Sequence, residues 1–313
     1  MFDLAPDTIY LTEGGTETEI MFRHGFEFPH FAVFELLKDR RATELLHDMF
    51  RRYLDAVADS GCAALMSGLD YRASPDWAGL LGYSDAGLAE IQAQCLDFLR
   101  DVAAPYRDQI PDIVIAGIIG PRGDAYALNR TISADEAQEY HAVQLANLKR
   151  FGADMAWGAT FNNVPEAVGL ARAAADVGVP LNLSFTLTSD HILRSGVTLK
   201  EAVLAVDEEA GAARPHSYGI NCSHPLEYAP ALEPGDWFNR VQNIRPNAAM
   251  MDKMALCKLN HLEEGDPEEL ARLMGDLARE APQISMWGGC CGSWDRHLRL
   301  IAKAVMAARS ASA

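Results

Sequence analysis

Two short segments of this 313-residue chain hold cysteines in an arrangement that suits a metal ion. Segment 288–292 reads Gly-Gly-Cys-Cys-Gly, and Cys222 follows an asparagine far upstream. The adjacent Cys290 and Cys291 are poorly placed to form a disulfide with each other, because the closed ring is strained. The flanking glycines leave the backbone free to turn, so both thiolates can reach one ion. Three thiolates suit zinc and leave the fourth position of a tetrahedral site open, as in catalytic zinc sites.

The other cysteines and two nearby histidines have simpler interpretations. A lone cysteine usually behaves as a small buried apolar side chain, and we interpret Cys62, Cys95 and Cys257 in this way. His224 and His297 lie close in sequence to the cysteine segments. Histidines beside a site often orient a neighbour or cap a helix, so we leave both out of the ligand set.

A metal site of this kind needs elements that bring distant segments together. Short apolar runs alternate with amphipathic helical patterns along the chain. This alternation predicts an α/β fold, a (β/α)8 TIM barrel formed as one domain by residues 1–313. Cys222 and the cysteine pair would follow the sixth and eighth strands, at the carboxyl ends where barrel enzymes place their sites. The eight expected strands are 9–12, 63–67, 113–119, 155–159, 181–185, 217–221, 247–252 and 284–287.

Capping residues mark the expected helix starts. Ser133, Asn163, Thr198 and Asp266 are each followed three residues later by a glutamate, which is the spacing of a capping box. Apolar residues at four-residue steps predict a further helix over 43–60. A doubly wound open sheet shares this local pattern, but no glycine-rich dinucleotide fingerprint follows the first strand to favour it.

Three segments together resemble the homocysteine S-methyltransferase family, which includes betaine- and S-methylmethionine-dependent enzymes. Segment 13–18 reads Glu-Gly-Gly-Thr-Glu-Thr and is similar to the family's acidic-Gly-Gly opening. Segments 219–222 and 288–292 are similar to its Asn-Cys and Gly-Gly-Cys-Cys-Gly motifs, and His297 falls where the family tends to carry histidine. The resemblance spans almost the whole chain.

The resemblance implies a (β/α)8 barrel with Zn2+ held by Cys222, Cys290 and Cys291. It also implies methyl transfer from a small onium donor, such as S-methylmethionine or betaine, to a thiol acceptor. Homocysteine is the expected acceptor and methionine the product. The residues expected to contact substrate are Glu13, Gly14, Gly15, Asn162 and Asn221.

Thiol chemistry agrees with this expectation. An alkyl thiol is mostly protonated at neutral pH, whereas the thiolate is the nucleophile. Coordination to zinc removes the proton and holds the sulfur for in-line attack on a cationic methyl donor. Ring faces attract such cations, and Tyr71, Trp77 and Tyr126 lie in expected loops after the second and third strands.

The chain departs from the family pattern at two acidic positions. The family commonly opens with aspartate, whereas this chain has Glu13, which is one methylene longer. After the fourth strand the family often carries a glutamate that holds the amino acid, but this chain has Ala159 there. Asn162 is a neutral candidate for the same contact, and Asn163 has the alternative role of a helix cap. Two alternatives therefore stay open: zinc-dependent methyl transfer or demethylation on a different sulfur compound, and a non-catalytic zinc or redox-sensing protein.

The amino-acid composition indicates which classes of partner and which cellular compartment to expect. The chain has 44 acidic and 27 basic residues and a formal net charge of −17. Such a field repels nucleic acids and anionic membranes, and no apolar stretch is long enough to span a bilayer. Residues 1–7 lack the basic and apolar regions of a signal peptide, so we expect none. Six cysteines are too sparse for a disulfide scaffold, which favours a cytoplasmic location. The sequence leaves a homo-oligomer open.

Overall fold

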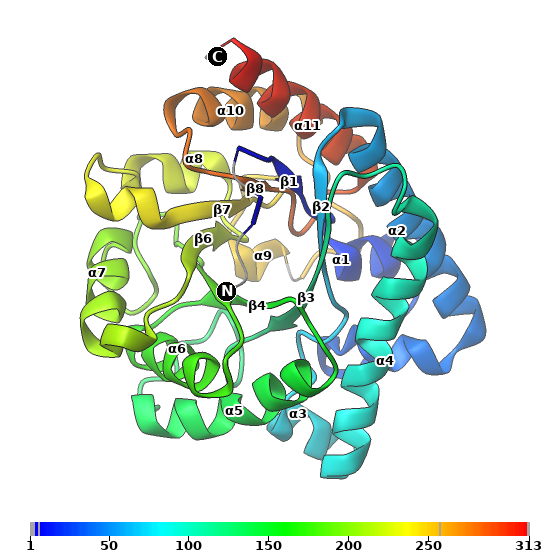
Figure 1. Ribbon diagram of the computed structural model, residues 1–313, viewed down its shortest axis with the longest axis vertical. Helices are drawn as coiled ribbons and strands as arrows, with labels where there is room; N and C mark the ends of the chain where they lie inside the picture. The colour runs from blue at the N-terminus through cyan, green and yellow to red at the C-terminus, as the bar shows by residue number, and fades with distance from the viewer. Residues whose placement is uncertain (1–3, 6, 257, 312–313) are drawn as a thin grey trace.

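The computed structural model describes residues 4–311 except 6 and 257, and it confirms the (β/α)8 barrel. Eight parallel strands pair in chain order, and β1 closes the barrel by pairing with both β2 and β8 (Figure 1). The strands are β1 Tyr10–Leu11, β2 Ala63–Ser67, β3 Ile113–Ile119, β4 Met155–Phe161, β5 Leu181–Phe185, β6 Ser217–Asn221, β7 Val241–Arg245 and β8 Met286–Trp287.

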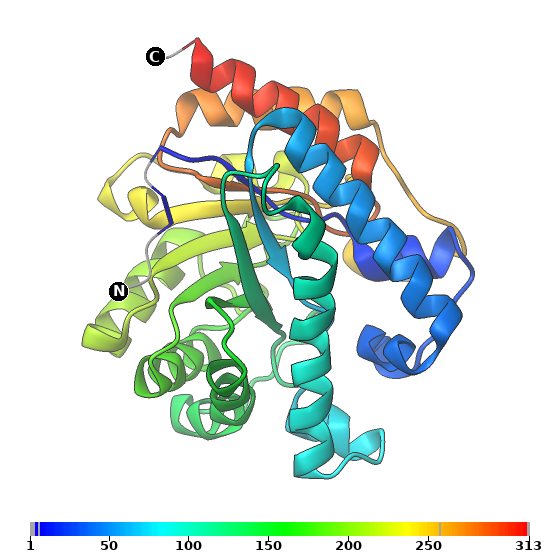
Figure 2. The same cartoon turned by 45° about the vertical axis from the view of Figure 1, so that its right-hand side comes forward.

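Helices surround the strands, and α10 and α11 lie side by side on one flank of the barrel (Figures 1 and 2). Among the described residues, no helix is both long enough and apolar enough to cross a membrane. The helices are α1 Thr16–Phe22, α2 Arg40–Ser60, α3 Pro75–Leu80, α4 Asp85–Ala103, α5 Ala134–Arg150, α6 Val164–Val177, α7 Leu199–Ala210, α8 Pro225–Tyr228, α9 Lys253–Leu256, α10 Pro267–Glu280 and α11 Asp295–Ser310.

The expected helix caps are confirmed. Ser133 and Thr198 form capping boxes at the starts of α5 and α7. Asn163 and Asp266 accept backbone N–H bonds at the starts of α6 and α10. The helix expected over 43–60 begins earlier, at Arg40, because the Asp39 carboxylate accepts the N–H of the first turn.

The expected strand at 247–252 is wrong. The seventh strand is Val241–Arg245, which pairs with β6 and β8, and Pro246 follows it directly. Polar residues such as Asn243 lie buried inside the barrel, so the strand lacks the apolar run that usually marks a parallel strand. Residues 247–252 instead cross the carboxyl end of the barrel. Smaller differences at the ends of β1, β4 and β8 amount to one or two residues, the usual uncertainty of element boundaries.

The barrel interior is apolar at one end and polar in the middle. Near the amino ends of the strands, Tyr10, Leu65 and Met286 belong to a buried apolar cluster. Farther along, the Asn182 amide donates to Ser217 Oγ at 2.8 Å and accepts from the Asn243 amide at 2.9 Å. These bonds satisfy most of the buried polar atoms, although the Asn243 side-chain oxygen has no hydrogen-bond partner. The side chains of these two layers fill the barrel below its carboxyl end, where the candidate functional site lies.

Candidate metal centre and substrate cavity

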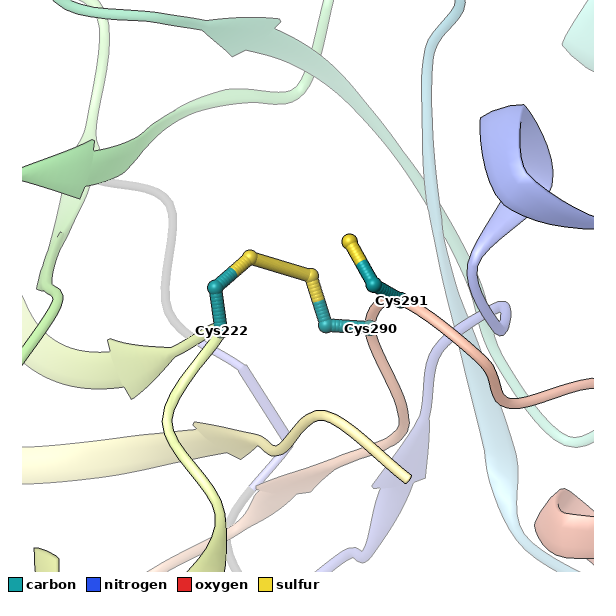
Figure 3. A group of neighbouring side chains, drawn as sticks. All are labelled: Cys222, Cys290 and Cys291. Carbon is teal, nitrogen blue, oxygen red and sulfur yellow. A yellow bond between two sulfur atoms is a disulfide. The ribbon is translucent and has the colours of Figure 1, made fainter. Parts of the chain in front are cut away.

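Three cysteines from two distant segments meet at the carboxyl end of the barrel. Cys222 follows β6, and Cys290 and Cys291 lie in the loop after β8 (Figure 3). Their sulfur atoms all lie within 4.8 Å of one another. Histidine, cysteine, aspartate and glutamate are the side chains that commonly bind metal ions. Among the described residues, these three cysteines are the one group of such side chains close enough together to hold an ion. The convergence expected from the barrel fold is therefore present.

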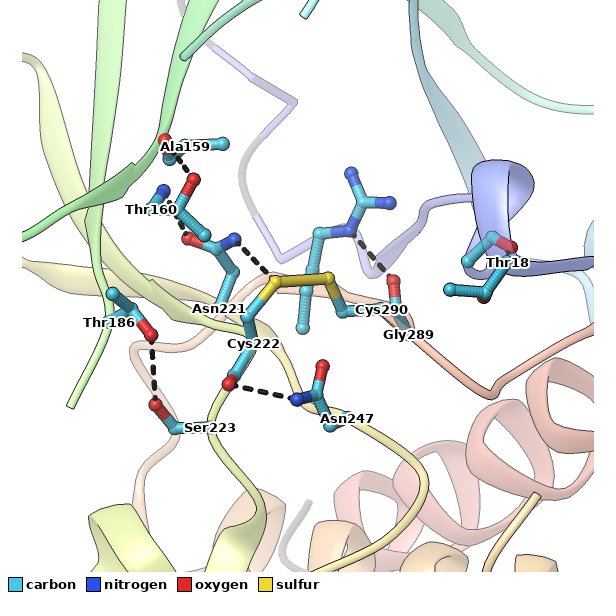
Figure 4. Close-up of a disulfide and its surroundings, with 12 residues drawn as sticks. Thr18, Ala159, Thr160, Thr186, Asn221, Cys222, Ser223, Asn247, Gly289 and Cys290 are labelled. Carbon is cyan, nitrogen blue, oxygen red and sulfur yellow. Dashed lines mark hydrogen bonds between the residues drawn. A yellow bond between two sulfur atoms is a disulfide. The ribbon is translucent and has the colours of Figure 1, made fainter. Parts of the chain in front are cut away.

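Two of the three sulfurs are joined in this structure. Cys222 and Cys290 form a disulfide, with their Cα atoms 5.6 Å apart, and Cys291 stays outside it (Figures 3 and 4). This pairing differs from the expectation of three available thiols. A metal binds thiolates, so both cysteines of the disulfide must be reduced before the three can act as ligands together.

The reduced site fits a zinc ion. At a zinc–sulfur distance of about 2.3 Å, a tetrahedral site holds its sulfurs roughly 3.8 Å apart. The observed cluster spans at most 4.8 Å, so small side-chain rotations bring it to that size. A set of three sulfur donors favours zinc over magnesium or calcium, which prefer oxygen ligands.

Backbone geometry and asparagines orient Cys222. Its φ of +54° is unusual for a residue other than glycine, and such outliers gather at functional sites. Its N–H donates to the Arg245 carbonyl at 3.1 Å, and the Asn247 amide donates to its carbonyl at 3.0 Å. The Asn221 amide donates to the Cys222 sulfur at 3.3 Å and accepts from the Thr160 N–H at 2.8 Å (Figure 4). Asn221 thus links β4 to Cys222.

Glycines bring the loop after β1 against the loop after β8. A Cβ atom on Gly14 would lie 2.6 Å from the Ser293 carbonyl oxygen, and one on Gly15 would clash with the Cys290 carbonyl. Within segment 288–292, Gly292 alone among the three glycines has a positive φ, of +84°. Close approach of two backbones therefore explains most of these glycines better than the conformational freedom expected from the sequence.

A cavity of about 370 Å3 adjoins the cysteines. Four of the five residues expected to contact substrate line it, namely Glu13, Gly14, Gly15 and Asn221. Ala159 also lines the cavity, so the wall has a methyl group where the family often carries a glutamate. The aromatic residues Tyr71, Trp77 and Tyr126 belong to the lining as well.

Asn162 does not line this cavity. Its buried amide donates to the Ala125 carbonyl at 2.7 Å, and so holds the loop after β3 in place. Its neighbour Asn163 is the N-cap of α6, as the alternative interpretation predicted. In this structure Asn162 supports the cavity wall from behind.

Glu13 is bound by protein groups in this structure. One carboxylate oxygen lies 2.8 Å from Arg245 Nη2, and the other accepts the Ser67 N–H at 3.0 Å. Arg245 also donates to the Gly289 carbonyl, and its guanidinium lies 4.0 Å from the Trp157 ring centre. Both charged side chains are buried, so their mutual neutralisation stabilises each one.

Among the charged residues that line the cavity, the sequence predicted Glu13 but not Glu17, Arg72 or Arg245, nor Asp124, Lys253 and Glu263. Arg245 ends the strand that was misplaced, which hid its position at the carboxyl edge of the barrel. Glu17 lies inside the acidic-Gly-Gly motif, where the motif itself gives no sign of a separate role. Arg72 follows Tyr71 in the loop after β2, and no local pattern marks its charge as functional.

Helix α9 and the chain after it cover one side of the cavity with Leu256, Leu259 and Leu262. Lys253 begins this helix and donates to the Leu187 carbonyl, with Glu227 Oε2 at 3.4 Å. Burial lowers the pKa of Lys253, and the Glu227 carboxylate opposes that shift.

Cys62, Cys95, His224 and His297 lie outside the group of three cysteines. Cys62 and Cys95 are buried outside any disulfide, and burial raises the pKa of both thiols. His224 caps α8, and His297 Nε2 lies 2.9 Å from the Glu264 carbonyl. The interpretation of Cys257 falls on a residue outside the described ones.

Known proteins share both the sequence pattern and the fold. The model of a family described as homocysteine S-methyltransferase matches residues 10–305. Homocysteine S-methyltransferase YbgG of Bacillus subtilis (strain 168) is 26% identical over 286 residues, which is 83% of each chain. The homocysteine methyltransferase MmuM of Escherichia coli has a TM-score of 0.73 in its metallated form, at 20% identity over 95% of this chain and 96% of that one.

The oxidised form of MmuM gives the same TM-score of 0.73, at 21% identity and the same coverage. At such low identity the structural likeness establishes the fold alone. The match to the family model establishes membership of the family, because it covers the barrel from β1 into α11 and includes both cysteine segments. On that ground this chain belongs to the homocysteine S-methyltransferase family, whose members transfer a methyl group to homocysteine.

Proposed function

We propose that this chain is a zinc-dependent methyltransferase that moves a methyl group from a small onium donor to homocysteine and releases methionine. S-methylmethionine and betaine are the donors to test first. Residues 1–313 act as one catalytic domain, and Cys222, Cys290 and Cys291 are the zinc ligands. The observation that carries the proposal is the meeting of these three sulfurs beside a closed-in cavity.

Cys222, Cys290 and Cys291 would hold the zinc ion, whose chemistry when bound would be to lower the pKa of an acceptor thiol. The protein's own residues supply the rest. Asn247 bonds the Cys222 backbone, Asn221 bonds its sulfur, and the packed glycines position Cys290. The cavity would align acceptor and donor beside the sulfurs, which lowers the entropic part of the barrier.

The cavity wall suits a cationic methyl donor. Tyr71, Trp77 and Tyr126 present aromatic rings to the cavity, and ring faces attract sulfonium and quaternary ammonium groups. Transfer of the methyl group leaves the donor neutral at the onium atom, so a product of this kind is held less tightly by the rings.

The reducing state of the site is part of the proposal. Three thiolates are needed, whereas a disulfide uses two of them. We therefore propose a reducing compartment such as the cytoplasm as the place of action. The metallated and oxidised forms of the Escherichia coli enzyme are consistent with a site that exists in both states.

Metal analysis tests the proposal most directly. Protein purified under reduction should carry one zinc ion per chain and methylate homocysteine with at least one onium donor. Cys290→Ala should lose the zinc and the activity, whereas Cys62→Ala, at a buried cysteine far from the cluster, should keep both. Zinc retained by the Cys290→Ala variant would contradict the assignment of the ligands.

A donor panel separates the remaining alternatives. Turnover with another thiol, and none with homocysteine, would favour a different sulfur compound as the acceptor. Full zinc occupancy without turnover of any donor or acceptor would favour a non-catalytic zinc or redox-sensing protein. The disulfide between two of the proposed zinc ligands is the observation that favours the redox-sensing alternative.

A further inference from the structure

Glu17 places a carboxylate in the substrate cavity without a protein partner. It lies in the first turn of α1 and lines the cavity beside the cysteines. Within the described residues, no side chain forms a hydrogen bond or an ion pair with this carboxylate. Desolvation raises the pKa of Glu17, with nearby Arg245 and Arg72 opposing and Glu13 adding to the shift. A cationic ligand would supply the missing partner.

Arg72 presents the opposite charge in the same cavity. Its side chain is 8% exposed, and its guanidinium lies 4.6 Å from the Trp77 ring centre and 5.2 Å from that of Tyr71. One terminal nitrogen donates to the Gly123 carbonyl. The buried Nε has no hydrogen-bond partner, and among the described residues no carboxylate pairs with this guanidinium. An anionic ligand would complete it.

The other charged residues of the cavity wall already have partners. Arg245 pairs with Glu13, and Lys253 pairs with Glu227. Asp124 accepts the Tyr126 N–H at 2.8 Å, and Glu263 lies 3.6 Å from His261. Among the described lining residues, Glu17 and Arg72 therefore stand out as opposite charges that are close enough to interact and bound by no countercharge.

We propose that Glu17 and Arg72 form a clamp for a zwitterionic α-amino acid, in which Glu17 binds the ammonium group and Arg72 binds the carboxylate. This inference rests on the proposed function and identifies which residues select the acceptor. Neither of the two acidic positions that the family pattern points to offers an unpaired carboxylate here. Glu13 is occupied by Arg245 and Ser67, and position 159 is alanine.

The chemistry of homocysteine fits this arrangement. Its thiol is separated by two methylenes from the carbon that bears both charged groups. With the sulfur at the cysteine cluster, the ammonium and carboxylate lie a few ångströms away, inside the same cavity. Glutamate to ammonium and arginine to carboxylate are charge-assisted hydrogen bonds, which are stronger than neutral ones.

Methionine binding tests the clamp without zinc or methyl donor. Calorimetric titration of reduced, metal-free protein would compare methionine with γ-(methylthio)butyrate, which lacks the ammonium group, and with γ-(methylthio)propylamine, which lacks the carboxylate. Wild-type protein should bind methionine about 10- to 100-fold more tightly than either analogue, the range expected for one charged hydrogen bond.

Charge-removing variants should erase this discrimination selectively. Glu17→Gln should bind methionine and γ-(methylthio)butyrate about equally while still rejecting the amine. Arg72→Gln should bind methionine and γ-(methylthio)propylamine about equally while still rejecting γ-(methylthio)butyrate. The conservative variants Glu17→Asp and Arg72→Lys should each keep part of the wild-type preference for methionine. Glu280→Gln, which removes the same charge from the exposed end of α10, should leave all three affinities unchanged.

Two results would overturn the clamp. One is a Glu17→Gln or Arg72→Gln variant that weakens methionine and both analogues equally, as a purely structural residue would. The other is a wild-type protein that does not distinguish the three ligands. Failure of the proposed function looks different, because an inactive protein with an intact pattern of discrimination would refute methyl transfer alone.

Discussion

At the scale of single residues, Arg245 connects the interior of the barrel to the candidate site. It contacts Glu13, Ser67 and the Gly289 carbonyl, and so joins the loops after β1 and β8 to the end of β2. A buried ion pair of this kind adds little to the folding free energy compared with an apolar pair of the same shape. Removing only one of the two charged side chains, however, destabilises the fold strongly. The partner left behind would be a buried, uncompensated charge.

Arg245→Met should therefore destabilise the protein by about 3–5 kcal/mol, because it leaves the Glu13 carboxylate unpaired. Urea unfolding of the reduced protein measures the loss. The double variant Glu13→Gln with Arg245→Met should recover part of it, since no charge stays buried. A single variant as stable as the wild type would show that Glu13 finds another partner.

Asp70 is a second buried carboxyl with a measurable consequence. Its side chain is fully buried, one oxygen accepts the Ile118 N–H at 3.0 Å, and the other has no partner. Desolvation raises the pKa of Asp70 to about 7. The folded protein thus holds this proton more tightly than the unfolded chain does.

Ionising Asp70 therefore costs folding free energy as the pH rises from about 4, where the unfolded chain begins to lose the proton, to about 7. Asp70→Asn removes this titration. The stability of the variant relative to wild type should increase over that pH range and stay level above it. Urea unfolding at a series of pH values gives the comparison, and a pH-independent difference would contradict the shifted pKa.

At the scale of elements, the site is held together by two loops packed backbone to backbone. The Gly15 N–H donates to the Ser293 carbonyl at 2.9 Å, and the Gly289 N–H donates to the Glu13 carbonyl at 3.3 Å. The cysteine pair is therefore positioned by the loop after β1 as much as by β8 itself. A side chain between these backbones would displace the cysteines.

Gly14→Ala should lower the zinc affinity and destabilise the fold by about 1–3 kcal/mol, as overpacking does. The cause is the 2.6 Å contact that its Cβ would make with the Ser293 carbonyl oxygen. Gly79→Ala is the matched control, because its Cβ meets nothing within 4 Å inside α3. That variant should bind zinc normally and gain up to about 1 kcal/mol from helix propensity. Equal behaviour of the two variants would refute the packing argument.

At the scale of the whole molecule, the barrel does not depend on the metal for its core. One large apolar cluster fills the space between the strands and the helices, and a smaller one fills the amino end of the barrel. The cysteines lie at the opposite end, in loops. Zinc would therefore stabilise the folded state by binding linkage and not by creating the fold.

Removing zinc from the reduced protein with a chelator should abolish activity and leave the far-UV circular dichroism spectrum unchanged. The melting temperature should fall, because a ligand at 1,000 times its Kd contributes about 4 kcal/mol. Added zinc should restore both properties, provided that the thiols stay reduced. Unfolding on chelation, as in zinc fingers, would contradict a self-sufficient barrel.

Local features of the sequence were enough to predict the barrel and the three cysteines that meet at its carboxyl end. Seven of the expected strands coincide with strands of the structure, and the four expected caps begin helices. The cysteine segments were found because their residue types are rare and their chemistry is specific. Strand order around a barrel then places the ends of β6 and β8 at one face without further information.

Tertiary structure alone decided the charge arrangement of the cavity. Whether Glu13 is free or neutralised depends on Arg245, more than two hundred positions away, and the polar pattern of β7 concealed that partner. Whether Glu17 and Arg72 are paired depends on which side chains reach the same cavity. The sequence determined the fold and the candidate sulfur ligands, because periodicity and residue type act locally. Pairing, burial and the joining of two cysteines depend on distances between remote segments, and only the folded chain sets those distances.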